Sequence, residues 1–145
     1  MKKDIANLIL VFVILQVLFH FLLPIKIIYA PYNYIGIFLI VIGFLPNLWI
    51  GIKFRKINTA LWPHETPSKL ITTGMFKFSR NPNYLGMVVM LVGIAVFLGS
   101  LIPFVVPIVF FILINKFNVA VEEKILKKKF GKKYLNYQKK VRRWL

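Results

Sequence analysis

The sequence contains no cysteine, and this absence excludes several kinds of chemistry at once. A chain with no thiol forms no disulfide, offers no thiolate to a metal and has no thiol nucleophile. Only two histidines are present, so a zinc site, which draws its ligands from Cys, His and carboxylates, is not expected. We therefore predict neither a bound metal nor a thiol-based mechanism.

Acidic residues are also scarce, with 4 Asp and Glu against 20 Lys and Arg and a formal net charge of +16. In a soluble protein such an excess indicates nucleic-acid binding. Here 59% of the residues are hydrophobic and the mean hydropathy is +0.73, whereas soluble domains are about 45–50% apolar. The composition therefore favours a membrane protein, and nucleic acid is not an expected partner.

Long apolar runs supply the membrane segments, because crossing a bilayer takes roughly 20 mostly apolar residues. We predict an all-α integral membrane protein with four spans, at about 5–23, 34–52, 84–99 and 101–121. The first run follows two lysines but has no small-residue cleavage site after it, so we interpret it as a retained helix. Gly99 and Ser100 separate the last two spans, which predicts a tight antiparallel hairpin.

The whole chain, residues 1–145, is predicted to form one domain, with its N-terminus, the 53–83 loop and the 122–145 tail on one side of the membrane. Apart from Lys26, the lysines and arginines lie in these segments or toward the adjoining end of the fourth span. The positive-inside rule then places both termini in the cytoplasm, with the basic tail near anionic lipid headgroups. The Lys- and Ile-rich composition is compatible with the cell membrane of a bacterium or archaeon.

A few polar and small residues interrupt the spans. Gln16 and His20 lie four residues apart on one helix face, and we interpret them as helix-packing or interfacial residues rather than catalysts. Asn47 follows Pro46 in the second span, where it either lines a cavity or hydrogen-bonds a neighbouring helix. Glycines at seven-residue spacing predict a close-packing face in the second and third spans: Gly36, Gly43, Gly86 and Gly93.

The cytoplasmic end of the fourth span carries a polar stripe of Asn115, Asn118 and Glu122, at positions i, i+3 and i+7. Glu122 and Glu123 are adjacent, so on an α-helix they point about 100° apart and do not form a paired acid–base site. Lys127 follows Glu123 at i+4, which predicts a surface ion pair. Glu122 is therefore predicted to be the carboxylate that faces a cavity.

The tail is predicted to hold two helices, one ending near Gly131 and an amphipathic one beginning near Lys132. One face of the second helix carries its aromatic and apolar residues, Tyr134, Tyr137, Val141 and Trp144. Two interpretations stay open: this helix anchors the tail at the membrane interface, or it closes a cytoplasmic pocket.

The segment FSRNPNYLG, residues 78–86, joins the loop to the third span. Asn81 is a favoured N-cap, and Pro82 suits the first position of a helix. A helix N-terminus beside Arg80 is also a ready site for a carboxylate or a phosphate.

The segment LITTGMFKFSRNPNYLGM, followed after a helical hairpin by EEKILKKKFGKKYLNY, resembles the integral membrane methyltransferases. These are the isoprenylcysteine carboxyl methyltransferases and the related phospholipid N-methyltransferases. The resemblance covers roughly residues 70–137, and the two motifs in this order are more specific than either alone. It implies S-adenosylmethionine as methyl donor, bound on the cytoplasmic side by the loop, the start of the third span, the end of the fourth and the tail.

The resemblance also implies which residues contact this cofactor. They are Ser68, Lys69, Leu70, Ile71, Phe76, Asn81, Pro82, Asn83, Tyr84 and a glutamate of the Glu122–Glu123 pair. Methyl transfer from a sulfonium needs positioning and desolvation rather than a triad or a metal. Arg80 and Glu122 are the candidate catalytic residues: Glu122, or alternatively Glu123, pairs with the cofactor's ammonium, and Arg80 or the amides near Asn81 hold its carboxylate. Tyr84 and Phe76 are candidates to pack on the adenine or face the sulfonium.

Departures from the family's pattern leave the methyl acceptor open. The isoprenylcysteine enzymes carry histidine at the positions of Ser68 and Asn81, tyrosine at Phe76, and at Asn118 an arginine associated with the substrate carboxylate. We expect a lipophilic acceptor reached from the bilayer, most like an isoprenylcysteine, with a phospholipid headgroup or a small thiol, amine or phenol as alternatives. Asn118 and Asn47 are the candidate contacts to it.

Two functions of other classes compete with an enzyme: a small four-helix transporter and a non-catalytic membrane adaptor. A transporter usually needs a charged group deep in a span, but the acidic residues Asp4, Glu65, Glu122 and Glu123 lie at or beyond span ends. An adaptor gives no reason for the polar stripe. The discriminating observation is whether the arginine and tyrosine of the third-span motif converge with the stripe glutamate on one cavity.

Overall fold

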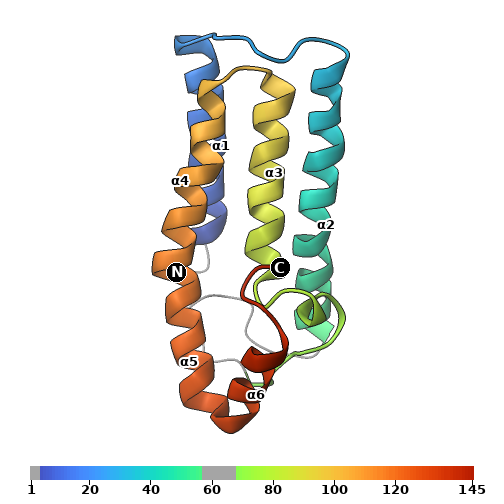
Figure 1. Cartoon of the computed structure of the whole chain (residues 1–145), viewed down its shortest axis with the longest axis vertical. Coiled ribbons are helices and arrows are strands. Elements are labelled where there is room, and N and C mark those ends of the chain that lie inside the picture. Colours follow the sequence, from blue (N-terminus) through green and yellow to red (C-terminus); the bar gives the residue numbers. More distant parts are fainter. Residues whose placement is uncertain (1–3, 57–67) are drawn as a thin grey trace. The chain divides into compact units, whose positions relative to one another are not determined.

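The structure, a computed structural model, describes residues 4–56 and 68–145, which form helices and short turns. The helices are α1 (Asp4–Leu22), α2 (Ile35–Lys56), α3 (Pro82–Leu98), α4 (Val105–Leu113), a π-helical segment (Ile114–Val119), α5 (Ala120–Phe130) and α6 (Lys132–Lys140) (Figure 1). Three 3-10 turns accompany them, at Tyr32–Tyr34, Gly74–Lys77 and Ile102–Phe104. The predicted all-α class is thus confirmed for the described residues. The rest of the predicted cytoplasmic loop, residues 57–67 with Glu65, lies outside them.

Within residues 4–56 and 68–145, three helices are long and apolar enough to cross a bilayer: Ile5–Leu22, Tyr32–Lys56 and the continuous helix Ile102–Phe130. The fourth apolar helix, α3, is shorter, at 17 residues. The helix of the last predicted span continues through α5 to Phe130, which matches the predicted helix end near Gly131. Helices of this length and composition support an integral membrane protein.

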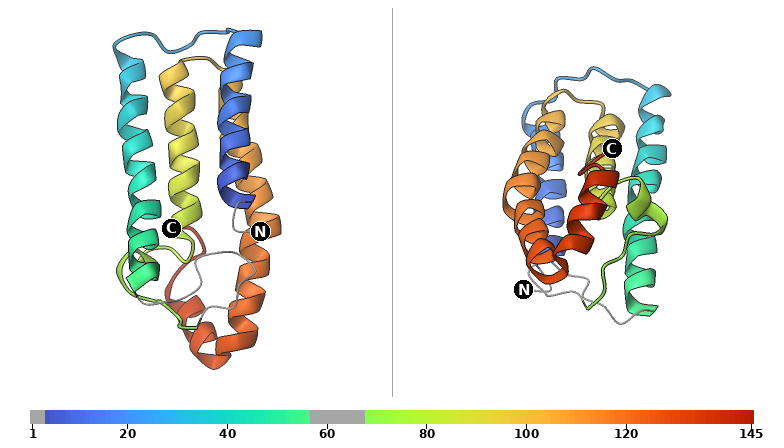
Figure 2. Two further views of the ribbon diagram at one scale, coloured as in Figure 1. Left: turned by 180° about the vertical axis from the view of Figure 1, so that it is seen from behind. Right: turned by 60° about the horizontal axis from the view of Figure 1, so that its bottom comes forward.

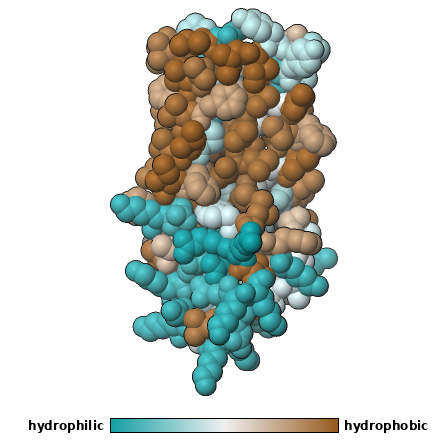
Figure 3. All heavy atoms as spheres, viewed as in Figure 1, coloured by the Kyte–Doolittle hydropathy of each residue, from teal (hydrophilic) through white to brown (hydrophobic). Residues whose placement is uncertain are grey.

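The chain divides into two compact units, each built from two stretches of sequence. The apolar unit comprises Met1–Leu45 and Gly86–Ile112, and the charged unit comprises Pro46–Leu85 and Leu113–Leu145. On the face drawn in Figure 3, the side chains of the apolar unit are mostly hydrophobic (brown) and those of the charged unit mostly hydrophilic (teal).

Within the apolar unit, α2 and α3 lie side by side and approach each other at glycines (Figures 1 and 2). A Cβ atom on Gly43 would lie 2.6 Å from the carbonyl oxygen of Gly86, and one on Gly93 would lie 2.8 Å from that of Gly36. Both distances are far inside van der Waals contact with backbone, which cannot move aside as a side chain can. The predicted close-packing face of the two spans is confirmed.

A buried glutamine joins α1 to α3 and to the turn before α4. The side chain of Gln16 is fully buried, and its Nε2 donates to the carbonyl oxygens of Leu91 at 2.8 Å and Pro103 at 3.2 Å. Pro107, four residues after Pro103, has no N–H group, so the oxygen of Pro103 lacks the usual helical donor. Gln16 supplies a donor in its place, which stabilises the interior of the unit.

The connection between α3 and α4 is tight, as predicted. Gly99 has a φ of +70°, a conformation that favours glycine, and the turn Ile102–Phe104 leads into α4. Ser100 is fully buried, and its Oγ lies 2.7 Å from His20 Nδ1 in a hydrogen bond. Both polar residues of the first span, Gln16 and His20, therefore pack helices together, as predicted.

The charged unit contains the end of α2, the segment 68–81, the first turn of α3, α5, α6 and the C-terminal residues. α5 ends at Gly131, which has a φ of +49°, and α6 follows directly. α6 is shorter than predicted: it ends at Lys140, and Val141 is extended at φ −125° and ψ 130°. The chain leaves the helix there because residues 141–143 run back along the start of α3, where the backbone N–H of Arg80 donates to the carbonyl oxygen of Arg142 at 3.1 Å.

Candidate functional site

A cavity of about 130 Å³ lies within the charged unit. The end of α2, the segment 69–76, the start of α3, α5 and α6 all contribute to its wall. The lining residues are Ile50, Phe54, Lys69, Leu70, Ile71, Phe76, Arg80, Asn81, Asn83, Tyr84, Glu122, Glu123, Ile125, Leu126, Tyr134 and Tyr137. The arginine and tyrosine of the third-span motif thus reach the same cavity as both glutamates.

The structure brings together most, but not all, of the candidate site residues. Those that line the cavity are Lys69, Leu70, Ile71, Phe76, Arg80, Asn81, Asn83, Tyr84, Glu122 and Glu123. The lining does not include Ser68, Pro82, Asn47 or Asn118. Ser68 is exposed, and Pro82 is buried at the first position of α3.

Glu122 has a neutral partner. The hydroxyl of Tyr84, on the first turn of α3, donates to Glu122 Oε1 at 2.6 Å, and the tyrosine is only 3% exposed. A phenol hydroxyl satisfies one oxygen of the carboxylate but supplies no countercharge. Among the ion pairs of the described residues, none involves Glu122. The Glu122 carboxyl group therefore lines the cavity without a cationic partner from this part of the chain.

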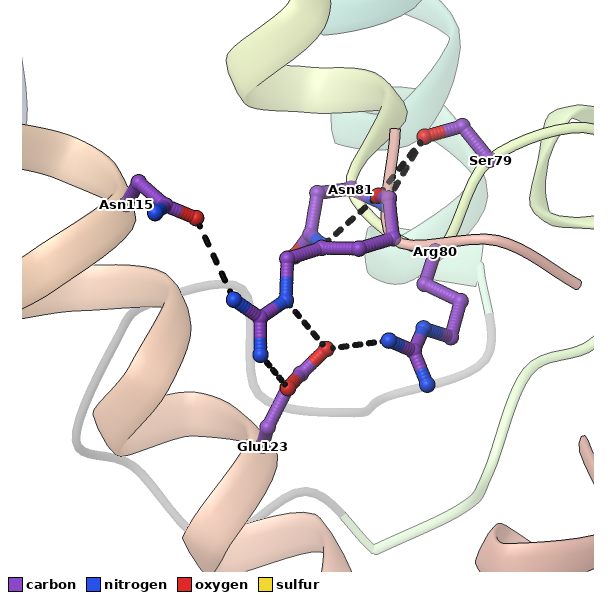
Figure 4. Close-up of polar contacts among 6 residues, drawn as sticks. Ser79, Arg80, Asn81, Asn115 and Glu123 are labelled. Atoms are coloured by element: carbon purple, nitrogen blue, oxygen red, sulfur yellow. Dashed lines mark hydrogen bonds and ion pairs between the residues drawn. The ribbon is translucent and has the colours of Figure 1, made fainter. Parts of the chain in front are cut away.

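Glu123, in contrast, has two cationic partners (Figure 4). Arg80 Nη2 lies 2.9 Å from its Oε1, and Arg143 donates through Nη2 to Oε2 at 2.6 Å and through Nε to Oε1 at 3.2 Å. The glutamate side chain is 12% exposed. The predicted surface pair with Lys127 is therefore wrong: the two guanidinium groups hold Glu123 inside the unit instead.

The π-helical segment explains why the sequence pattern misplaced Glu123. A π turn takes one residue more than an α turn, so every side chain after it is displaced by one position around the helix axis. Asn115 precedes most of the segment, and its Oδ1 accepts a hydrogen bond from Arg143 Nη1 at 3.4 Å (Figure 4). Asn115 therefore shares a partner with Glu123 rather than a face with Glu122. The predicted stripe from Asn115 to Glu122 assumed an uninterrupted α-helix.

The start of α3 is held by the C-terminal residues. α3 begins at Pro82, as predicted, and Asn81 precedes it. The side-chain Nδ2 of Asn81 donates to the carbonyl oxygen of Arg143 at 3.0 Å, and the Ser79 hydroxyl donates to the same oxygen at 3.3 Å. The Ser79 oxygen also accepts from the N–H of Asn81 at 3.1 Å. These contacts place Arg80 and Asn81 between the cavity and the last residues of the chain.

α6 turns its aromatic side chains into the charged unit. Tyr134 is 1% exposed, and the hydroxyl of Tyr137 donates to the carbonyl oxygen of Phe76 at 2.6 Å. Burial, together with the nearby charge of Glu123, raises the pKa of Tyr134 to about 12, so its phenol is neutral at physiological pH. Of the two interpretations of this helix, the arrangement supports the one in which it closes a pocket, because its aromatic face is already covered by protein.

Sequence reasoning missed Arg143, and it named Tyr134 and Tyr137 only as part of a helix face that either anchors the tail or closes a pocket. The tyrosines had a signal, since they lie three residues apart on the aromatic face of a predicted helix. Arg143 had none, because it stands among many basic residues near the end of the chain.

Comparisons with known proteins give this site a context. The model of the phospholipid methyltransferase family matches residues 32–133 of the chain. A "Probable protein-S-isoprenylcysteine O-methyltransferase" of Oryza sativa subsp. indica, and another of the same name in subsp. japonica, are each 30% identical over 114 residues, covering 75% of this chain. The chain spans 58% of the length of these rice relatives. An uncharacterized protein of Haemophilus influenzae is 40% identical over 62 residues, which is 43% of this chain and 98% of that protein. No solved structure matches the chain.

Proposed function

The chain belongs to the phospholipid methyltransferase family, and from this premise we propose that it is an S-adenosylmethionine-dependent methyltransferase with a lipophilic acceptor in the membrane. The observation that carries the proposal is that Arg80, Tyr84 and Glu122 line one cavity. They come from two motifs far apart in the sequence, and together they put a positive and a negative group on the wall of one small space.

The chemistry of these residues fits the proposed cofactor. The amino-acid end of S-adenosylmethionine carries an ammonium and a carboxylate. Glu122, whose partner is the neutral hydroxyl of Tyr84, offers a carboxylate without a cationic partner among the described residues, and a cofactor ammonium would favour its charged form. Arg80 binds Glu123 through Nη2, while its buried Nε has no hydrogen-bond partner among the described residues, so the guanidinium has donor capacity left for a carboxylate.

The remaining wall suits the adenosine part of the cofactor and the exclusion of water. The rings of Phe54 and Phe76 lie with their centroids 6.0 Å apart, and both line the cavity. Ile50, Ile125 and Leu126 add aliphatic surface. An aromatic and aliphatic wall favours a flat nucleobase and removes water from the reacting groups.

S-adenosylmethionine, when bound, supplies a methyl group that is already activated by its sulfonium. In this proposal Glu122 and Arg80 bind and orient the amino-acid end, and Tyr84 fixes the Glu122 carboxylate through its hydroxyl. The aliphatic residues keep the site dry. Positioning and desolvation of this kind are the main contributions a protein makes to a displacement on an activated donor.

For the acceptor we propose a lipophilic molecule most like an isoprenylcysteine, in line with the name of the rice relatives. Phospholipid headgroups and small lipophilic thiols or amines are the alternatives. Transfer of labelled methyl groups to each acceptor in turn, with detergent-purified protein, distinguishes these classes. We also propose Asn118 and Asn47 as acceptor contacts, because both lie in the charged unit close in sequence to cavity residues.

Calorimetric binding of S-adenosylhomocysteine to the purified chain tests the proposed cofactor. We expect Glu122→Gln to weaken binding at least about tenfold, because a charge-assisted contact to the ammonium is lost. Asp4→Asn is the matched control, since it makes the same carboxylate-to-amide change at the start of α1. Failure of the folded wild-type chain to bind would refute the function, and unchanged affinity in Glu122→Gln would refute the role of that carboxylate.

The four-span arrangement with both termini in the cytoplasm is part of the proposal. The absence of cysteine allows a direct test, because a single introduced cysteine is the sole thiol in the chain. In intact cells a membrane-impermeant maleimide should label Lys26→Cys and not Lys129→Cys. The reverse pattern would invert the proposed orientation.

A further inference from the structure

Arg143 is held at both ends by the charged unit. Its guanidinium forms a fork on Glu123, with Nη2 to Oε2 at 2.6 Å and Nε to Oε1 at 3.2 Å, and its Nη1 reaches Asn115 (Figure 4). Its carbonyl oxygen accepts from the side chains of Ser79 and Asn81. A side chain fixed in this way has a defined position, so its charge acts at a defined place.

The charges of this cluster do not cancel. Arg80 and Arg143 bring two positive charges to the single carboxylate of Glu123, which leaves one positive charge in excess. Arg143 does not line the cavity, whereas Arg80 does. The excess charge therefore reaches the cavity through Arg80. If Arg143 were neutral, Arg80 and Glu123 would form a balanced pair, and the attraction for an anionic group would largely disappear.

Two donors near the start of α3 are already engaged by the C-terminal residues. The N–H of Arg80 donates to the carbonyl oxygen of Arg142 at 3.1 Å, and the Asn81 side-chain amide donates to that of Arg143. The sequence analysis considered both Arg80 and the amides near Asn81 for a carboxylate. The guanidinium of Arg80 lines the cavity and carries the positive charge among these candidates.

We propose that Arg143 is a positioning residue that keeps the Arg80 end of the cavity positively charged and thereby selects ligands with a carboxylate. This inference rests on the proposed function, in which the carboxylate belongs to S-adenosylmethionine. Arg143 acts by binding Glu123. The carboxylate is then shared between two guanidinium groups and does not fully neutralise the charge of Arg80. The residue touches no ligand itself.

Two ligands that differ only in the carboxylate test this role: S-adenosylmethionine and its decarboxylated form. Their binding to the detergent-purified full chain is compared by calorimetry. We expect the wild type to prefer the carboxylate form, and Arg143→Gln to lose about tenfold of that preference through weaker binding of that form alone. Arg143→Lys, which keeps the charge, should restore most of the preference. Arg55→Gln is the matched control, because it removes an exposed guanidinium of the same unit.

A second variant changes the net charge of the Arg80–Glu123–Arg143 cluster in the opposite direction. Glu123→Gln leaves both guanidinium groups without their carboxylate and should increase the preference for the carboxylate form. A purely structural cluster would instead lose affinity for both ligands in both variants, and that result would overturn the inference. An unchanged preference in Arg143→Gln would also overturn it. Binding of neither ligand by the folded wild type would refute the proposed function itself, which is a distinct result.

Discussion

The two units of the molecule use their polar side chains in opposite ways. In the apolar unit, Gln16 donates to backbone carbonyl oxygens and His20 bonds a buried serine, so polar groups satisfy other groups of the fold. In the charged unit, Glu122, Glu123 and Arg80 line a cavity, and Glu122 has no cationic partner among the described residues. Polar groups that bond other groups of the fold have a structural role, whereas charged groups gathered on a cavity wall mark a candidate ligand site.

The largest expected effect is a loss of stability in the apolar unit. Gly43→Ala places a Cβ 2.6 Å from the carbonyl oxygen of Gly86, so α2 and α3 must separate. We expect a loss of about 3 kcal/mol or more in the free energy of unfolding, measured from thermal unfolding in detergent.

A glycine of the same helix provides the control. A Cβ on Gly51 meets no atom within 4 Å, so Gly51→Ala should leave stability unchanged or slightly raised. Equal stability of the two variants would show that α2 and α3 do not approach at Gly43.

An intermediate loss of stability is expected where a buried carbonyl oxygen of the apolar unit loses its hydrogen-bond donor. Gln16→Leu leaves the carbonyl oxygen of Pro103 buried with no donor, because Pro107 has no N–H. We expect a cost of about 1–3 kcal/mol in stability, with unchanged affinity for S-adenosylhomocysteine.

A substitution of Pro107 tests whether Gln16 acts as the donor that the helix lacks. In a Pro107→Ala background the helix regains an N–H, so Gln16→Leu should cost less there than in the wild type. Identical costs in the two backgrounds would show that the bond from Gln16 to the carbonyl oxygen of Pro103 does not contribute to stability.

The smallest effect appears only at high pH and belongs to the charged unit. The pKa of Tyr134 is raised to about 12, chiefly by burial, from an ordinary value near 10. The folded protein therefore keeps a proton that the unfolded chain releases. Stability is unaffected below pH 10 and falls as the pH rises from 10 to 12, by about 1–2 kcal/mol.

Unfolding midpoints measured between pH 9 and 12 check this effect. Tyr134→Phe should reduce the alkaline loss, whereas Tyr32→Phe, at a side chain that is 70% exposed in the apolar unit, should not. The same loss in both variants as in the wild type would assign it to other groups.

The helices could be predicted because a long run of apolar residues is enough to identify a membrane-spanning helix. Apolar runs, Pro82 at a helix start and Gly99 at a turn each act locally, and the structure follows them. The glycine spacing also succeeded, since close packing of two helices requires small residues at regular intervals.

The polar contacts were harder to predict because they depend on distant residues. The Lys127 partner of Glu123 was expected from helix spacing, but two arginines from other segments bind it instead. The aromatic face of α6 was recognised, yet an aromatic face looks alike in sequence whether lipid or protein covers it. Its burial against Phe76 therefore required the structure.

The π-helical segment Ile114–Val119 has a consequence for how relatives of this chain are aligned. It accommodates one residue more than an α-helix does along the same length of axis, which shifts the later side chains by one position. A homologue whose helix is α throughout would reach the same arrangement with one residue fewer, and its alignment would need a single gap between Asn115 and Glu122. Without that gap, Glu122 of this chain would be aligned with the counterpart of Glu123, so the gap decides which of the two adjacent glutamates is compared with which.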